Sequence, residues 1–308
     1  MTGLFIGNND GGNSDGDGGG GGDETAAGAP LGREALRLFM RNRAAVAGVI
    51  ILVGVIFMTY IGPSLYDQDP SRIIARPLQG PGTEDVPSFG TDYLGRDVFA
   101  GVVNGGDTTL RVALVATLMI VVIGVSIGAI AGFYGGRIDT ALMRFTEIFQ
   151  VMPALLFALV IVTLFEPSTM VIAISIGIVL WPSLARLTRA EFLRLRNLEF
   201  VKAAQAIGAS DARIMFRVML PNALPPLIVA TTLVMGTAIL FEAALAFLGL
   251  GDPNNISWGY LIGQNRGSVL GGWWTVTFPG LAIFFTVLSF SLIGDGLQDA
   301  FNPKLRGR

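Results

Sequence analysis

Six long apolar stretches alternate with polar, charged or glycine-rich ones along the chain. Because an α-helix rises about 1.5 Å per residue and the hydrocarbon of a bilayer is about 30 Å thick, stretches of this length predict membrane-crossing helices. Helices satisfy their backbone hydrogen bonds internally, as lipid requires of a spanning segment. The pattern therefore predicts an all-α, polytopic membrane protein with six transmembrane helices, over residues 44–62, 110–133, 148–165, 170–185, 223–249 and 276–293.

The remaining sequence divides into regions of distinct composition. A Gly- and Asp-rich tail has too little apolar surface to fold, so we predict that it is disordered. In the next segment, Leu36, Phe39 and Met40 share one side of a helix and arginines occupy the rest, which predicts an amphipathic segment on the membrane surface. The alternative is that the arginines of this segment only orient the first span and that the segment does not lie on the membrane surface. The predicted regions are the tail at 1–31, the amphipathic segment at 32–43, the first span at 44–62, an outer loop at 63–109, and a transmembrane domain at 110–308 that contains a charged loop at 186–222.

The basic residues orient these spans. They fall before the first span, after the last, or in the loops that follow the second and fourth spans, and the positive-inside rule makes that side cytoplasmic. Both termini are then predicted to be cytoplasmic, as an even number of spans requires, and 63–109 and 251–275 face the opposite side. This placement holds for all of the 21 Lys and Arg residues except Arg72, Arg76, Arg96, Arg111 and Arg266.

Composition excludes several kinds of chemistry. The chain is 52% hydrophobic and 14% charged, well below the charge of a typical soluble domain, and it contains no Cys and no His. Thiol nucleophiles, disulfides, zinc–imidazole sites and histidine-based triads are therefore excluded. The carboxylates do not cluster in sequence as metal ligands, and we expect no metal, no cofactor and no nucleic-acid partner for this chain.

One stretch faintly resembles a phosphate-binding loop. GTDYLGRD, at 90–97, carries two glycines five positions apart, but Gly95 is followed by Arg96 and Asp97. A Walker A loop needs Gly-Lys followed by Ser or Thr, so that Lys reaches the phosphates and the hydroxyl reaches magnesium. No such sequence occurs elsewhere. We expect that ATP and Mg²⁺ are used by a different subunit and that this chain is not an enzyme.

Three acidic residues lie in or near the spans. Glu147 and Asp295 fall at the predicted inner boundary, where an interfacial or capping role is favoured. Glu242 lies deeper, and an acid within a membrane helix is a functional hypothesis because its burial is costly. It could line a polar pathway or meet a partner subunit, although a structural packing role is slightly favoured.

Small residues mark one face of the second span. Gly124, Gly128 and Gly132 recur every four residues and form a smooth ridge on one side of a helix. Such ridges let two helices approach closely in a membrane. The ridge predicts a tight helix bundle.

The charged loop after the fourth span reads EFVKAAQAIGASDARIMFRVMLPN. Residues 189–207 predict a helix that Gly208 ends. Ser210 is a candidate N-cap for a second helix, with Asp211 in its first turn and Pro221 at its end. The product is a short rigid elbow that stands out of the membrane, although an ordinary ordered loop is the simpler alternative.

The spacing of this elbow resembles the EAA motif of ATP-binding cassette importer permeases. In that family the elbow is a coupling helix that docks into a groove on the ATPase subunit. Lys202 stands where the family's Glu is usual, which leaves the role of that position open, and Val218 stands where Ile is usual. The resemblance implies that the residues coupling to the ATPase are Lys202, Ala203, Ala204, Gly208, Asp211, Leu220 and Pro221.

Further motifs are similar to those of the C-type permease of dipeptide and oligopeptide importers. That resemblance implies the type I importer fold and a place in a prokaryotic inner or plasma membrane. It also implies a B-type permease partner, two cytoplasmic ATPases and an extracytoplasmic substrate-binding protein that delivers its ligand near the first outer loop and 258–264. The motifs are GTDYLGRDVF at 90–99, FEAALAFLGLG at 241–251, WGYLIG at 258–263 and LIGDGLQDAFNPKLRG at 292–307.

Other functions stay open at this point. The same type of permease serves nickel chelates or other small solutes, because selectivity in the family is often set by the binding protein. A self-sufficient secondary transporter would favour inverted repeats and broken helices around a midplane ion site, and the sequence shows neither. A membrane enzyme lacks candidate catalytic residues and is the weakest alternative.

Overall fold

The computed structural model describes residues 31–84 and 86–301, which form helices and loops without a β-strand. The predicted tail at 1–31 therefore lies outside the described residues, except that Leu31 begins the first helix. The helices are α1 (Leu31–Arg41), α2 (Arg43–Tyr60), α3 (Gly62–Leu65), α4 (Val98–Tyr134), α5 (Gly136–Val151), α6 (Ala154–Thr163), α7 (Thr169–Arg196), α8 (Glu199–Ala206), α9 (Asp211–Arg213), the π-helical turn η1 (Ile214–Met219), α10 (Leu220–Leu245), the π-helical turn η2 (Ala246–Leu250), α11 (Trp258–Asn265), the 3₁₀ turn η3 (Arg266–Ser268) and α12 (Trp274–Phe301).

Five described helices are long and apolar enough to cross a membrane, namely α2, α4, α7, the continuous helix Asp211–Leu250, and α12. A further pair, α5 and α6, passes the same test together but bends by 81° between its two helices. Six spans are thus confirmed when this pair counts as one, but the single straight helix predicted over 148–165 is wrong. Met152 is extended and Pro153 lacks an N–H, so the α-helical hydrogen bonds stop there.

Several spans extend beyond the apolar runs that predicted them. Helix α4 begins at Val98, so the end of the predicted loop 63–109 is helical. The side chain of Asp97 accepts hydrogen bonds from the backbone N–H groups of Phe99 (2.8 Å) and Ala100 (3.3 Å) and thereby caps α4. Helix α7 continues through charged residues to Arg196. Charge ends an apolar run without ending a helix, and this explains the misplaced boundaries.

The glycine ridge of α4 lies against the backbone of α7. A Cβ atom on Gly124 would stand 3.0 Å from the carbonyl oxygen of Trp181, and one on Gly132 would stand 2.7 Å from that of Arg189. Gly128 is as tightly placed against Ala185. The predicted role of the ridge is confirmed, and the two helices form a closely packed pair.

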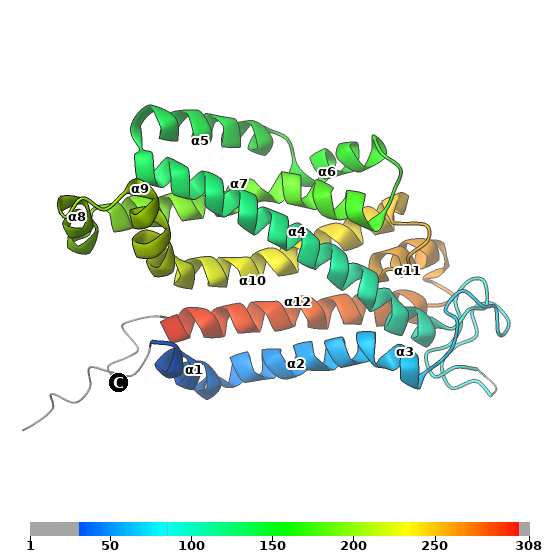
Figure 1. Ribbon diagram of the computed structural model, residues 1–308. Helices are drawn as coiled ribbons and strands as arrows, with labels where there is room; N and C mark the ends of the chain where they lie inside the picture. The colour runs from blue at the N-terminus through cyan, green and yellow to red at the C-terminus, as the bar shows by residue number, and fades with distance from the viewer. Residues whose placement is uncertain (1–30, 85, 302–308) are drawn as a thin grey trace, which may run out of the picture.

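The chain presents two different ends (Figure 1). Helices α8, α9 and α1 lie at one end together with the last turns of α12, and the loop after α3 and helix α11 lie at the other. Asn42, between α1 and α2, donates a hydrogen bond of 2.9 Å to Asp299 of α12 and fastens the start of the described chain to its end. We call the first end the inner end and the second the outer end.

Candidate functional site

The elbow at the inner end is made of α8, α9 and η1. The single helix predicted over 189–207 is wrong, because α7 ends at Arg196 and Leu198 adopts an extended conformation before α8 begins. This break turns α8 away from the axis of α7, so that it projects beyond the bundle (Figure 1). The elbow therefore stands off the membrane-spanning helices.

Gly208 ends α8 as predicted. Its φ of 79° lies in the left-handed region, where a residue without Cβ is favoured. The N–H of Ala209 donates to the carbonyl of Ala204 at 3.1 Å, and the N–H of Gly208 donates to that of Gln205 at 3.0 Å. This pair of hydrogen bonds is a Schellman motif, which fixes the turn by backbone contacts alone.

The second half of the elbow differs from the sequence prediction. Ser210 occupies the N-cap position of α9, but its side chain makes no capping hydrogen bond. Pro221 does not end a helix, because it lies in the first turn of α10, directly after the π-helical turn η1. A proline in the first turn removes an N–H that needs no intrahelical partner there. The elbow thus continues without interruption into the fifth span.

Buried apolar side chains hold the elbow on the bundle. Val201 of α8 and Ile214 and Met219 of η1 are at most 1% exposed, and they pack in one cluster with Phe192 and Leu195 of α7. Burying a side chain of this size stabilises a structure by about 1.5–3 kcal/mol. The base of the elbow is accordingly fixed, although its tip is in solvent.

The residues predicted to couple to an ATPase gather on this elbow. Lys202, Ala203, Gly208, Asp211 and Pro221 are exposed, whereas Ala204 and Leu220 are half-buried. Lys202 makes no ion pair with the acidic residues that the structure describes. The alanines and the glycine form a patch of small residues on the tip.

Three apolar residues on the same elbow were not predicted from the sequence. Ile207 is 85% exposed, Phe200 42% and Phe216 65%. An elbow outside the membrane gains nothing from presenting such side chains to water, so they suit contact with another protein. The sequence signal that could have identified them is their position in a charged loop, beside a predicted turn.

At the outer end, glycines of α11 pack against α10 and η2. A Cβ atom on Gly259 would stand 2.5 Å from the Cα of Ala243, and one on Gly263 would stand 2.8 Å from the carbonyl oxygen of Phe247. Trp258 is fully buried, and its indole N–H donates to the carbonyl of Val102 at 2.8 Å. The outer end is a closely packed unit.

Glu242 lies inside this unit, 1% exposed. The hydroxyl groups of Thr109 in α4 and Ser257 before α11 lie against its carboxyl group. Its Oε2 atom has no hydrogen-bond partner among the described residues. Glu242 therefore occupies the interior of the chain, as a packing role would require, and its predicted role in a pathway or a subunit interface stays a prediction.

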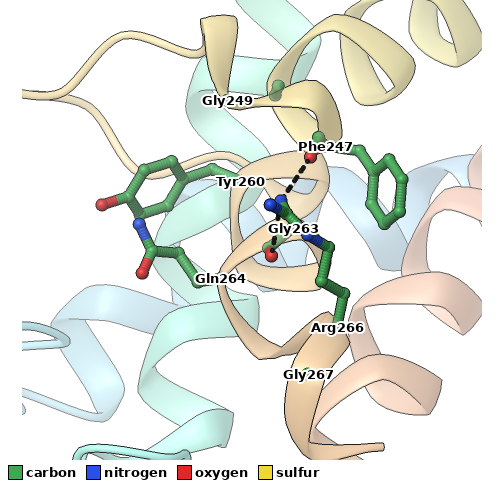
Figure 2. A pocket seen from close by; sticks show the side chains of 8 residues that line it. Phe247, Gly249, Tyr260, Gly263, Gln264, Arg266 and Gly267 are labelled. Carbon is green, nitrogen blue, oxygen red and sulfur yellow. Dashed lines mark hydrogen bonds between the residues drawn. The ribbon is translucent and has the colours of Figure 1, made fainter.

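A hollow of about 500 Å³ opens beside α11. Arg266 lies in its wall, where one guanidinium nitrogen donates to the carbonyls of Phe247 (3.2 Å) and Gly263 (3.3 Å), while Tyr260 and Gln264 stand opposite (Figure 2). These three side chains line the hollow with one cation and two polar groups. The arrangement suits a polar ligand.

The stretch that resembled a phosphate loop forms a tight turn beside this hollow. The carboxylate of Asp92 accepts from the backbone N–H groups of Leu94 (2.9 Å) and Arg96 (2.8 Å) and pairs with the Arg96 side chain. The hydroxyl of Tyr93 donates to Gln264 of α11. The hydrogen-bond donors of this stretch thus hold the turn together and fasten it to α11.

Burial and hydrogen bonds shift the pKa values of two ionisable groups near the outer end. Burial alone would raise the pKa of Asp252, but hydrogen bonds, led by those from Asn255 and Thr169, outweigh it and lower this pKa below its ordinary value. Burial and, after it, the hydrogen bond to Asp97 raise the pKa of Tyr66 to about 12. Asp252 fastens the start of α7 to the end of η2, and Tyr66 fastens α3 to the cap of α4.

Comparisons with known proteins agree on one family. Residues 124–307 match the family described as binding-protein-dependent transport system inner membrane component, and residues 30–81 match the N-terminal transmembrane domain of oligopeptide transport permease C. The chain is 40% identical over 280 residues to the dipeptide transport system permease protein DppC of Alkalihalophilus pseudofirmus, covering 89% of this chain and 90% of that one. It is 37% identical over 285 residues to the oligopeptide transport system permease protein OppC of Haemophilus influenzae, covering 91% and 90%.

One group of solved structures shares the fold. The chain matches an inward-facing conformation of the MetNI methionine ABC transporter with a TM-score of 0.52 and 20% identity, over 65% of this chain and 96% of that one. At this identity the likeness speaks for the fold alone, and it agrees with the predicted type I importer permease.

Proposed function

The chain belongs to the family of binding-protein-dependent transport system inner membrane components, and on that premise we propose that it is a permease subunit of an ATP-driven importer of short peptides. The named relatives are dipeptide and oligopeptide permeases. The proposed assembly contains a B-type permease, two cytoplasmic ATPases that use ATP and Mg²⁺, and an extracytoplasmic substrate-binding protein. This chain forms half of the translocation pathway and hydrolyses nothing itself.

The observation that carries the proposal is the elbow at the inner end. Its tip combines small residues and exposed apolar side chains, with Ile207 85% exposed, and its base is buried in the bundle. A partner that pushes on the tip therefore moves the inner ends of α7 and α10 with it. Such a rigid transmitter is what coupling between ATP hydrolysis and transport requires.

The charge distribution supports a topology for this function. The inner end carries α8, α9 and the arginines of α1, and we propose that it faces the cytoplasm of a prokaryotic cell, with both termini on that side. The outer end then faces the binding protein. The hollow beside α11, with Arg266 and Gln264, lies where a delivered peptide would arrive.

Substitution of Gly208 tests the coupling role. Gly208→Val forces a β-branched residue into a backbone conformation with φ of 79° and reshapes the tip without meeting any neighbouring atom. We expect an inserted, assembled complex whose peptide uptake and stimulation of ATPase activity by the loaded binding protein fall on the order of tenfold, which corresponds to about 1.4 kcal/mol of coupling. The measurement uses the complete transporter in proteoliposomes.

Gly136 supplies the matched control. It lies at the same end, has a positive φ of 55°, and a Cβ atom added to it would also meet nothing within 4 Å, but it begins α5 and lies outside the elbow. Gly136→Val should leave uptake near that of the parent. Equal uptake by the Gly208→Val variant and the parent would contradict the coupling assignment.

Two alternatives give different results in the same vesicles. If the importer serves nickel chelates or another small solute, the loaded binding protein stimulates ATP hydrolysis with that solute and not with dipeptides. If the chain is a self-sufficient secondary transporter, it moves solute alone and follows an ion gradient without ATP.

A further inference from the structure

The break between α5 and α6 borders a second hollow, of about 520 Å³, on the side of α7. This volume is in the range of small-ligand sites, which is about 300–1,000 Å³. Both helices and α7 contribute to its wall, and the residues are Phe149, Gln150, Val151, Met152, Pro153, Ala154, Val179, Leu180, Pro182, Ser183 and Arg186.

The broken backbone itself points to a wet surface. The carbonyl groups in the last turn of α5 have no N–H partner further along that helix, because the chain turns at Met152 and Pro153 brings no N–H. Inside a membrane, such backbone is tolerated where protein covers it or where it lines a water-filled cavity. The open hollow beside the break leaves room for water at these carbonyls.

Arg186 adds a cation to this wall. It is exposed and lies about 25 Å along α7 from Thr169, at about 1.5 Å per residue, directly after the apolar stretch 170–185 that predicted the fourth span. No carboxylate of the described residues lies within ion-pair distance of it. An unpaired cation at the inner edge of a span is available to a polar solute that passes there.

Two neighbouring arginines of α7 are held by carboxylates, unlike Arg186. One turn further on, Arg189 holds Asp139 of α5 through two hydrogen bonds, one of them 2.6 Å long. Arg194 holds Glu191 at 2.7 Å. These two cations fasten α7 locally, whereas Arg186 keeps its donors for the hollow.

The polar groups around Arg186 suit a zwitterion. Ser183 lies one turn before it on the same face of α7, and Gln150 stands in the last turn of α5. A guanidinium binds a carboxylate through two parallel hydrogen bonds, and the carbonyls at the end of α5 accept from an ammonium or amide N–H. Apolar residues such as Met152 and Leu180 leave room for side chains of varied size.

We propose that this hollow is a station on the translocation path where Arg186 binds the free C-terminal carboxylate of a passing peptide. The inference rests on the proposed function, since it names the chemical group of the substrate that this chain contacts. Contact with one terminal group and with backbone carbonyls is independent of the peptide's side chains. The site therefore suits a permease that carries many different peptides.

The absence of cysteine from the chain gives a direct test. In the complete transporter, Ser183→Cys should react with charged, membrane-impermeant methanethiosulfonate reagents added to the inner side. The ratio of the labelling rate with the anionic reagent to that with the cationic reagent should be severalfold higher in this variant than in the double variant that also carries Arg186→Gln. Leu118→Cys is the control, because Leu118 is 62% exposed in the middle of α4 on an apolar face and should stay unlabelled. An unreactive Ser183→Cys, or a reagent preference that Arg186→Gln leaves unchanged, overturns the proposal.

Protection identifies the ligand. A dipeptide at millimolar concentration should slow the labelling of Ser183→Cys, while the same dipeptide with an amidated C-terminus should protect severalfold less. Equal protection by the two compounds, or none by either, overturns the carboxylate contact. If labelling instead follows the fraction of anionic lipid in the vesicles, Arg186 faces lipid headgroups and the proposal fails.

A transport measurement separates this inference from the proposed function. Arg186→Gln should lower peptide uptake on the order of tenfold and Arg186→Lys less, with ATPase stimulation by the loaded binding protein retained in both. If uptake by Arg186→Gln equals that of the parent while peptides still stimulate the ATPase, only the station is excluded. If peptides do not stimulate the parent transporter, the proposed function itself is wrong.

Discussion

The two ends of this molecule are built in opposite ways. At the outer end, backbone meets backbone: a Cβ atom on Gly259 would stand 2.5 Å from Ala243, and Trp258 is completely buried. At the inner end, the tip of the elbow is held by a Schellman turn, and a Cβ atom on Gly208 would meet nothing within 4 Å.

This difference shows which parts of the structure are complete in one chain. At the outer end, the contact between α11 and α10 is buried within one chain, although Leu65, Leu270 and Trp273 are exposed elsewhere at that end. At the inner end, Phe200, Ile207 and Phe216 are exposed on the elbow itself. A surface of that kind is stable in a cell when a partner covers it. We therefore expect the packing of α11 against α10 to contribute more to the stability of the subunit than the tip of the elbow does.

The sharpest way to break this comparison is to add the same methyl group at both ends. Gly259→Ala forces α11 away from α10, and overpacking of this kind costs about 1–3 kcal/mol. We expect a clear fall in the melting temperature of the purified subunit in detergent. Gly208→Ala should lower it less, because only backbone strain is added. If Gly208→Ala destabilises more than Gly259→Ala, the assignment of stability to the outer end is wrong.

The second prediction concerns the release of Asp252, which acts through hydrogen bonds and not through packing. Because its pKa is lowered in the folded protein, the stability that it contributes is present above its ordinary pKa of 3.8 and is lost as the pH falls through the folded value. Asp252→Ala also leaves the N–H of Thr169 without its acceptor, at a cost of about 1–3 kcal/mol. Melting curves at pH 7 should show the loss, and the difference from the parent should shrink as the pH falls below 3.8.

The smallest expected effect is that of the hydroxyl of Tyr66. Tyr66→Phe keeps the ring beside Phe99 and removes only the hydrogen bond to Asp97, for a loss of about 1–2 kcal/mol. Since the pKa of Tyr66 is raised from 10.0 to about 12, its contribution is fully present below pH 10 and is lost as the pH rises toward 12. An unchanged melting temperature at pH 8 would show that this contact adds nothing to the outer end.

The fold was largely predictable because its signals are local. Apolar length gave the number of crossings, and the ridge of Gly124, Gly128 and Gly132 gave a close helix contact. Gly208 was recognisable as a helix end because a positive φ excludes most other residues. In each case the cause lies within a few residues of the effect.

The sequence predictions were wrong where distant contacts or single peptide units determine the helix boundaries and the exposure of side chains. The bend at Pro153 lies inside an apolar run that hydropathy alone cannot divide. The early start of α4 depends on the cap of Asp97, and the continuation through Pro221 depends on the π-helical turn before it. In the candidate site, the exposure of Ile207 follows from the direction of α8, which a sequence pattern does not specify.

The glycine ridge also limits how the bundle can move. Carbonyl oxygens of α7 lie in van der Waals contact with Cα atoms of α4, so one helix cannot slide a full turn along the other without lifting off it. In any motion that keeps the bundle packed, α4 and α7 move together as one rigid body. With 37 residues, α4 is about 55 Å long at about 1.5 Å per residue, so a tilt of this body by one degree shifts one tip of α4 by about 1 Å relative to the other.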